Sequence, residues 1–285
     1  MFTPIIVPLD GSARAERAIS YASTLAWALN GRIILFRALS VGESKPEAEA
    51  SLSQTSEKLA SDGVPAQMEV VFGEAAVKIA EIAEVERDSL IVMSTHGRSG
   101  LGRWLYGSVA EEVLRHVGVP VVLVSSGCER PWPLDRPLRV LAPVDGSELS
   151  EQALVSIGHF AETLHAELTL LHVLGPPVYA SSDTLAERPT NLESAEDQAI
   201  TYLKELGRRV QPGQLDPDVR VIVGHPHSAI ASTARREDLD LIAMATHGSG
   251  GYSRARLGSV ATVTIQQASV PTLLLSPISL VRPTE

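Results

Sequence analysis

The sequence predicts an α/β protein built from two tandem domains, each a parallel five-stranded sheet flanked by helices. Three observations lead to this fold class. The chain repeats itself once along its length, short apolar runs alternate with amphipathic segments, and the apolar runs show no polar residue at every second position. Uninterrupted apolar strands are typical of parallel sheets covered on both faces, and strand-helix alternation favours right-handed parallel crossovers.

The repeat is visible in matching strings. "IIVPLDGS" at residues 5–12 returns as "VLAPVDGS" at 140–147, and "LIVMSTHG" at 90–97 returns as "LIAMATHG" at 241–248. The offset between copies is 135 residues for the first pair and 151 for the second, so the second copy carries 16 extra residues. They fall around Gly175–Glu196, a segment rich in Pro, Ser and Thr that is interpreted as a loop.

A linker is predicted between the copies at "GCERPWPLDR", which is charged and contains two prolines. The predicted domains are therefore residues 1–126 and 137–285, joined by a linker at 127–136. Each half has the usual size of one domain.

Within the first copy the elements follow in order. Apolar runs predict strands at Ile5–Leu9, Ile33–Phe36, Met68–Phe72, Leu90–Met93 and Val121–Val124. Amphipathic segments between them, several stopped by glycine, predict helices at Ala13–Asn30, Glu47–Ser61, Ala75–Arg87 and Ser108–Val117.

Composition narrows the class of protein. Of 285 residues 44% are hydrophobic, and the formal net charge is −10. That charge argues against nonspecific nucleic-acid binding, which needs clustered Lys and Arg. The single cysteine, Cys128, indicates a reducing compartment. We see neither a signal peptide at the start nor an apolar run of the ~18 residues a membrane span needs, so a soluble, cytoplasmic protein is expected.

The candidate chemistry lies where the first and fourth strands end, since ligands of open parallel sheets bind beyond the carboxyl ends of the strands. The first strand ends at Asp10. After the fourth, Gly97 is followed by nine residues and then by Gly107-Ser108, and Gly248 is followed by nine and then by Gly258-Ser259. Glycines let backbone amides approach a ligand, and helix N-termini attract anions. Two arginines and no acidic residue in each loop add local positive charge. This pattern favours phosphate binding.

A structural interpretation of the same residues stays open. Ser108 and Glu111 have the spacing of a capping box, and Ser12 and Ser147 are good helix caps. The Asp-Gly pairs at residues 10–11 and 145–146 are common in turns. No P-loop motif occurs in the sequence.

At these residues the chain resembles the universal stress protein family in its tandem two-domain form, over nearly its whole length. Nucleotide-binding members carry Gly-x-x-Gly, nine residues, then Gly-Ser/Thr. The resemblance implies Rossmann-like domains, of the adenine nucleotide α-hydrolase-like type, with strand order 3-2-1-4-5. It also implies that each binds ATP, or ADP or AMP, with Mg²⁺ bridging the phosphates.

The implied nucleotide-binding residues come from matching positions in the two copies. Asp10 and Asp145 would contact ribose. Ala38 and Val173, with Leu9 and Val144, would line the adenine slot. The complete set is Pro8, Leu9, Asp10, Ala38, Met93, Ser94, Gly97, Arg98, Gly107, Ser108 and Val109 in the first half, and Pro143, Val144, Asp145, Val173, Met244, Ala245, Gly248, Gly258, Ser259 and Val260 in the second.

Both copies depart from the motif at its first glycine, which is Ser94 in one and Ala245 in the other. A small side chain fits there if the backbone keeps a negative φ; otherwise affinity falls. The copies can also differ in occupancy, because Ala38 leaves more room than Val173.

Other residues are given structural roles. His96 and His247 are interpreted as turn residues, and "HPH" at 225–227 is not expected to be a shared metal site because the first copy has "EAA" there. The final strands, "VPVVLVSS" and "VPTLLLSP", are expected to pair with each other within the chain, and a homodimer of chains is a further expectation.

Three functions remain open at this point. The first is a regulatory ATP-binding protein of the stress response without fast turnover. The second is a nucleotide-free interaction protein of the same fold. The third is a slow ATPase or adenylating enzyme, for which the sequence shows no nucleophile, general base or metal constellation.

Overall fold

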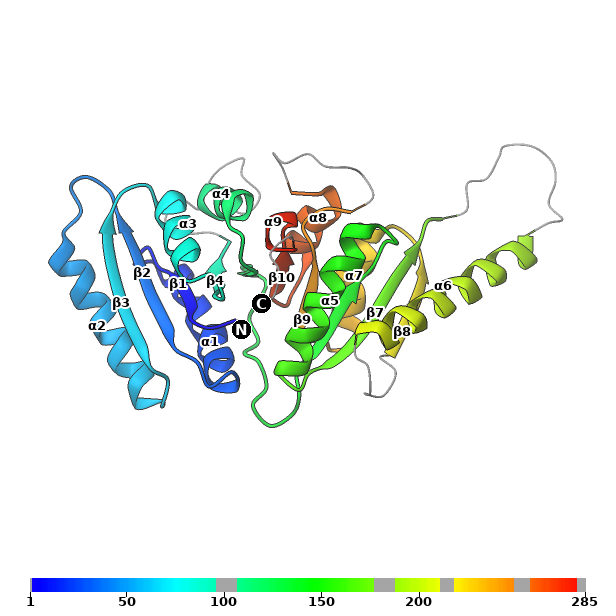
Figure 1. Ribbon diagram of the computed structural model, residues 1–285, viewed down its shortest axis with the longest axis horizontal. Coiled ribbons are helices and arrows are strands. Elements are labelled where there is room, and N and C mark those ends of the chain that lie inside the picture. Colours follow the sequence, from blue (N-terminus) through cyan, green and yellow to red (C-terminus); the bar gives the residue numbers. More distant parts are fainter. Residues whose placement is uncertain (1, 96–106, 177–187, 211–217, 249–256, 281–285) are drawn as a thin grey trace.

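The computed structural model describes residues 2–95, 107–176, 188–210, 218–248 and 257–280. Figure 1 shows two α/β halves side by side, with the chain crossing between them at the bottom of the view. The predicted fold class is confirmed: each half contains parallel strands with helices on both faces of its sheet.

The first half follows the predicted alternation with small shifts at the element ends. Its strands are β1 (Ile5–Pro8), β2 (Ile33–Leu39), β3 (Ala66–Phe72), β4 (Leu90–Ser94) and β5 (Val121–Val124). Its helices are α1 (Ala13–Ala28), α2 (Lys45–Ser61), α3 (Ala75–Val85) and α4 (Ser108–His116).

The second half repeats this order. Its strands are β6 (Arg139–Pro143), β7 (Glu167–Leu174), β8 (Asp218–Val223), β9 (Leu241–Ala245) and β10 (Thr272–Leu275). Its helices are α5 (Glu148–Thr163), α6 (Arg188–Val210), α7 (Pro226–Arg236), α8 (Ser259–Gln267) and α9 (Pro277–Leu280).

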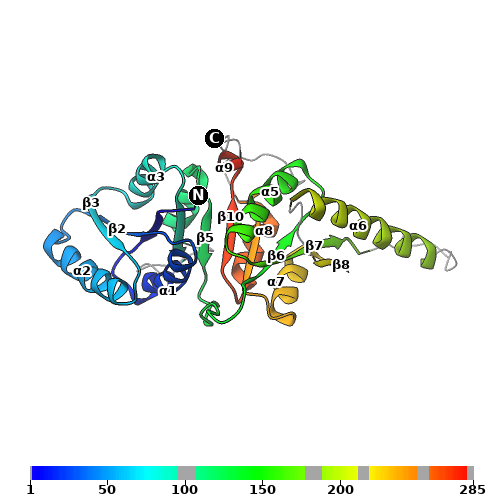
Figure 2. The same cartoon turned by 60° about the horizontal axis from the view of Figure 1, so that its bottom comes forward.

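One ten-stranded sheet runs through both halves, in the order β3-β2-β1-β4-β5-β10-β9-β6-β7-β8. Within each half the strands are parallel and follow the order third, second, first, fourth, fifth. The two final strands, β5 and β10, pair antiparallel, with Val122 opposite Leu273 (Figure 2). This pairing covers the apolar edge that each final strand would otherwise expose.

The helices divide between the two faces of the sheet. Apolar side chains of α1, α2, α5 and α6 pack on one face, and those of α3, α4, α7 and α8 pack on the other. Representative buried residues of the first face are Leu25, Leu52, Phe160 and Leu203, and those of the second are Ile79, Val113, Ile230 and Ile265.

Helix α1 shows why these segments are helical. The side chain of Ser12 caps its start, accepting a hydrogen bond from the backbone N–H of Ala15 at 3.2 Å. Its buried residues recur every three or four positions, which places one stripe against the sheet. The chain leaves the helix at Asn30, in the left-handed region with φ of 48°.

The edge strand of the first half departs from the predicted pattern of burial on both faces. β3 is an edge strand of the sheet, and its side chains are largely exposed, including Met68 at 47% and Phe72 at 56%. Some of its apolar side chains are still partly buried, and that of Val71 packs against the core. Apolar composition alone does not distinguish an edge strand from a central one.

The prediction of a loop over Gly175–Glu196 is partly wrong, because α6 begins at Arg188. Residues 177–187 lie outside the described residues. Pro189 falls in the first turn of the helix, where a missing N–H removes no intrahelical bond. The segment that follows contains several Glu, Ala and Leu residues, which are strong helix formers.

The predicted linker, 127–136, contains no helix or strand but contacts both halves. The hydroxyl of Tyr21 on α1 donates to the carbonyl of Arg130 at 2.8 Å, and its ring meets Trp132 edge-on at 5.1 Å. The indole N–H of Trp132 donates in turn to the carbonyl of Asp240, just before β9, at 2.8 Å.

Over the residues that the structure describes, no helix is long and apolar enough to cross a membrane.

Candidate functional site

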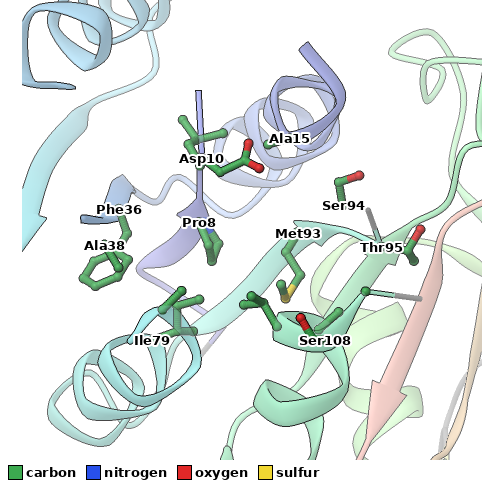
Figure 3. Close-up of a pocket in the computed structure, with 15 residues that line it drawn as sticks. Pro8, Asp10, Ala15, Phe36, Ala38, Ile79, Met93, Ser94, Thr95 and Ser108 are labelled. Atoms are coloured by element: carbon green, nitrogen blue, oxygen red, sulfur yellow. The ribbon is translucent and has the colours of Figure 1, made fainter. Parts of the chain in front are cut away.

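A cavity of about 200 Å³ opens at the carboxyl ends of β1 and β4, where the chain order of the first half reverses (Figure 3). It is lined by Pro8, Leu9, Asp10, Ala15, Phe36, Ala38, Ala75, Ile79, Met93, Ser94, Thr95, Gly107, Ser108, Val109 and Ala110. This is the place where open parallel sheets bind ligands.

The cavity brings together most of the site residues predicted for the first half. They are Pro8, Leu9, Asp10, Ala38, Met93, Ser94, Gly107, Ser108 and Val109. Gly97 and Arg98 lie outside the described residues. Residues far apart in the sequence thus meet because the carboxyl ends of β1, β2 and β4 and the start of α4 converge at one edge of the sheet.

The sequence interpretation missed six lining residues: Ala15, Phe36, Ala75, Ile79, Thr95 and Ala110. One of them had a usable signal. Phe36 precedes Ala38 by two residues on the same strand, so both point to one face of the sheet. Ala75 and Ile79 are one turn apart on α3, but no sequence pattern says which helix covers this cavity.

One side of the cavity is apolar. Figure 3 shows Phe36 and Ala38 on β2, Ile79 on α3 and Met93 on β4 around the same space. Phe36 is only 1% exposed, so its position is fixed by packing in the core. A flat apolar group fits between these side chains, because it would replace water there without burying unsatisfied polar atoms.

Asp10 sits on the opposite side of the cavity, in a turn that its own side chain forms. Its Oδ1 accepts the backbone N–H of Ser12 at 2.9 Å, and the intervening Gly11 has φ of 80°. The second half repeats the arrangement, with Ser147 donating its N–H to Asp145 at 3.0 Å. The turn interpretation of the Asp-Gly pairs and the cap interpretation of both serines are confirmed.

The start of α4 forms the polar end of the cavity. Gly107 is the N-cap residue of α4, with φ of 78°, and no side-chain hydrogen bond caps the helix. The predicted capping box is therefore wrong, because Ser108 is already helical and its exposed side chain is one residue past the cap. Glu111 instead pairs with Arg115 at 3.0 Å, one turn further along.

Backbone amides at this helix start are available to a ligand. The first intrahelical bond runs from the N–H of Glu111 to the carbonyl of Gly107 at 3.1 Å. The N–H groups of Ser108, Val109 and Ala110 accordingly have no acceptor within the helix. Together with the helix dipole they favour an anion at this end of the cavity.

The two departures from the glycine motif cause no backbone strain. Ser94 and Ala245 end β4 and β9, and neither has a positive φ. A side chain is therefore tolerated at both positions. That of Ser94 lines the cavity, so it takes space which a glycine would leave to a ligand.

The structure places the second-half candidates at the equivalent strand ends. Gly248 lies so close to the carboxylate of Asp145 that a Cβ there would overlap it. Met244, Val173 and Val260 share one apolar cluster. Pro143 ends β6 with Val144 and Asp145 after it, Ala245 ends β9, and Gly258 and Ser259 open α8.

Three of the four histidines singled out from the sequence lie within the described residues. Nδ1 of His247 lies 2.9 Å from the hydroxyl of Thr246, as suits a turn residue, and His96 is outside the described residues. His225 precedes α7 without a side-chain cap bond. Across the described ranges, no group of three or more His, Cys, Asp or Glu side chains could hold a metal ion.

Comparison with known sequences gives one family. The family model described as universal stress protein matches residues 1–125 and 138–276. A universal stress protein of Mycobacterium tuberculosis is 28% identical over 247 residues, covering 86% of this chain and 76% of the relative. One from Mycolicibacterium smegmatis is 25% identical over 296 residues, covering 96% and 97%.

Solved structures agree in fold. A protein from Pseudomonas aeruginosa described as a putative universal stress protein superposes with a TM-score of 0.70 at 18% identity, covering 97% of this chain and 94% of its own. A universal stress protein from Archaeoglobus fulgidus gives 0.68 at 21% identity, covering 95% and 97%. Both share the fold over nearly the entire chain.

Proposed function

The chain belongs to the universal stress protein family, and from this premise we propose that it is a regulatory protein that binds an adenine nucleotide, ATP first among them. One observation carries the proposal. The first half holds a cavity with an apolar slot at one end and free helix amides at the other. A nucleotide has the matching chemistry, with a flat base at one end and phosphates at the other.

Each part of the cavity supports one part of the ligand. The base would lie between Phe36, Ala38 and Ile79, where an aromatic ring and aliphatic groups meet. The carboxylate of Asp10 would accept a ribose hydroxyl. The phosphates would lie against the backbone amides of Ser108 and Val109, which line the polar end of the cavity.

The residues at the start of α4 fit a phosphate. Gly107 adopts a φ of 78°, a region that other residues rarely enter, so the turn before the helix depends on glycine. Ser108 adds an exposed hydroxyl beside the amides. Mg²⁺ would bridge the phosphates, since the described residues provide no carboxylate cage of their own.

We infer that turnover is slow. No Lys or Arg occurs among the described residues that line the cavity, so no cation there offsets the charge that develops in phosphoryl transfer. The protein would then act by holding nucleotide rather than by consuming it.

A second candidate is an interaction protein of the same fold that binds no nucleotide. The side chain of Ser94 favours it, because it occupies part of the cavity where nucleotide-binding members have glycine. Thermal unfolding separates the two candidates. A ligand at about 100 times its dissociation constant adds about 2.7 kcal/mol when it binds only the folded state.

We expect ATP with Mg²⁺ to raise the melting temperature by several degrees, and GTP at equal concentration to raise it less. Absence of a shift with ATP, ADP and AMP would establish the interaction protein instead. Phosphate release measured on the same samples tests the third candidate, since sustained turnover at about 1 s⁻¹ or faster contradicts a holding role.

A further inference from the structure

The two halves have the same fold but differ at the site itself. We infer that the chain takes up a single nucleotide, in the first half, and that the equivalent position in the second half does not bind one. The inference rests on the proposed function and adds to it which of the two repeated sites is used.

The wall that would contact the base differs between the halves. Phe36 lines the first cavity, and Leu171 stands at the same register position in the second half, opposite Pro143 as Phe36 is opposite Pro8. The second half therefore lacks the aromatic ring at this point. Stacking and edge contacts with aromatic rings add to area burial in holding a flat base.

Two neighbouring lining positions are larger in the second half. Ala38 becomes Val173, which adds two methyl groups at the same place on the strand. Ala75, at the start of α3, becomes Pro226 at the start of α7. The leucine in place of phenylalanine leaves some additional space, but it is fully buried in the core, whereas Val173 is only partly buried.

The phosphate end differs as well. The N–H of Gly258 donates to the carbonyl of Thr246 at 2.8 Å, so the glycine amide of the second motif is already used within the chain. Gly258 has φ of −58°, against 78° for Gly107 at the same motif position. The two glycine peptides therefore point in different directions at the starts of α8 and α4.

Close packing between β9 and the start of α8 maintains the hydrogen bond between Gly258 and Thr246. A Cβ at Gly258 would lie 2.9 Å from the carbonyl oxygen of Thr246, so β9 and the start of α8 approach each other as closely as glycine permits. Opening this end for a phosphate would require breaking the 2.8 Å hydrogen bond and separating the two segments. In the first half a cavity lined by Gly107, Ser108 and Val109 is already present at the equivalent place.

A matched pair of variants tests the inference. Ser108→Asp and Ser259→Asp each place a carboxylate at the first helical residue, which is exposed in both halves and where an acidic residue suits the helix dipole. Neither change should disturb folding. Each would repel a triphosphate bound at its own helix start. Gln54→Glu, exposed on α2, adds the same charge away from both sites and serves as the control.

Isothermal titration with ATP and Mg²⁺ gives the stoichiometry and the affinity. We expect one nucleotide per chain in the natural protein, a loss of affinity of about tenfold or more in Ser108→Asp, and unchanged binding in Ser259→Asp and Gln54→Glu. Two nucleotides per chain, or a loss confined to Ser259→Asp, would overturn the inference and leave the proposed function intact. No binding by the natural protein would overturn the proposed function itself.

Discussion

Arg136 and Asp240 form a bidentate ion pair between the linker and the second half, with Nη1 to Oδ2 at 2.6 Å and Nη2 to Oδ1 at 3.0 Å. The carboxylate of Asp240 is fully buried. It also accepts Nη2 of Arg130 at 2.7 Å and the backbone N–H of Arg139 at 2.9 Å. The predicted linker is thus attached to the second half at a defined point.

We expect Asp240→Asn to lower the free energy of unfolding by about 2–3 kcal/mol. The substitution removes a buried charge that two guanidinium groups share, and it turns an amide toward donors that need an acceptor. Both arginines are partly exposed, so water compensates some of the loss. Urea unfolding followed by the fluorescence of the buried Trp132 measures the change.

Asp238→Asn is the matched control. Asp238 also pairs with Arg130, but it is exposed, and asparagine tolerates its positive φ of 53°. We expect no measurable change, because exposed ion pairs contribute little. Equal destabilisation by the two variants would show that burial of Asp240 does not matter.

Tyr21 should make stability depend on pH in the alkaline range. Burial raises the pKa of its hydroxyl from 10.0 to about 12, with a smaller contribution from the neighbouring Cys128. Above pH 10 the unfolded chain loses this proton while the folded chain keeps it until about pH 12. Stability is therefore complete below pH 10 and falls as pH rises, by about 2–3 kcal/mol at pH 12.

Urea midpoints from pH 9 to 12 measure this slope, and Tyr21→Phe should flatten it. The same variant should cost about 1 kcal/mol at pH 8, since the carbonyl of Arg130 loses its donor. Tyr202, whose pKa is also raised by burial and by its hydrogen bond to Glu151, remains in both proteins. Identical slopes with and without Tyr21 would contradict the assignment.

Cys128 should be chemically inert in the folded protein. It is buried beside Ser125, and burial raises the pKa of its thiol, which lowers the fraction of reactive thiolate at neutral pH. We expect a disulfide reagent to modify it at least about tenfold more slowly in buffer than in urea. Because the chain has a single cysteine, one absorbance trace measures the rate. A fast reaction in buffer would show that the linker opens readily.

Much of the fold could be predicted because repetition and periodicity are local signals. The strand-helix alternation of the first half follows from apolar runs and glycine stops, and the predicted class is confirmed. The exposure of β3 does not follow from its apolar run, since it depends on which strand ends the sheet, and only the strand order that the family resemblance implies places β3 there. The start of α6 was missed because Pro189 was interpreted as a loop residue rather than as a first-turn residue.

The part of the candidate site that is formed by motif residues could be predicted from the sequence. Asp10, Ser94 and Gly107 mark strand ends and a helix start, and the cavity joins them. Ile79 was missed because its contribution depends on how α3 packs in three dimensions, whereas Phe36 could have been found from its spacing of two residues from Ala38 on β2. The difference in φ between Gly107 and Gly258 could not be predicted either, because the sequence has glycine at both positions.

Ala38→Val tests whether the slot beside β2 receives the base. The change puts into the first half the residue that the second half has at this position, and it adds two methyl groups to the wall of a cavity of about 200 Å³. Valine favours strands, and Ala38 is only partly buried, so the fold should keep its stability. We expect the affinity for ATP to fall by about tenfold while the melting temperature without ligand stays within about 2 °C.

The reverse change, Val173→Ala, is the control within the same chain. It removes the methyl groups from the second half but restores neither an aromatic ring at Leu171 nor the amide of Gly258 that Thr246 engages. Titration should therefore still give one nucleotide per chain. If Ala38→Val binds ATP as tightly as the natural protein, the base does not lie against β2, and the orientation assigned to the nucleotide is wrong.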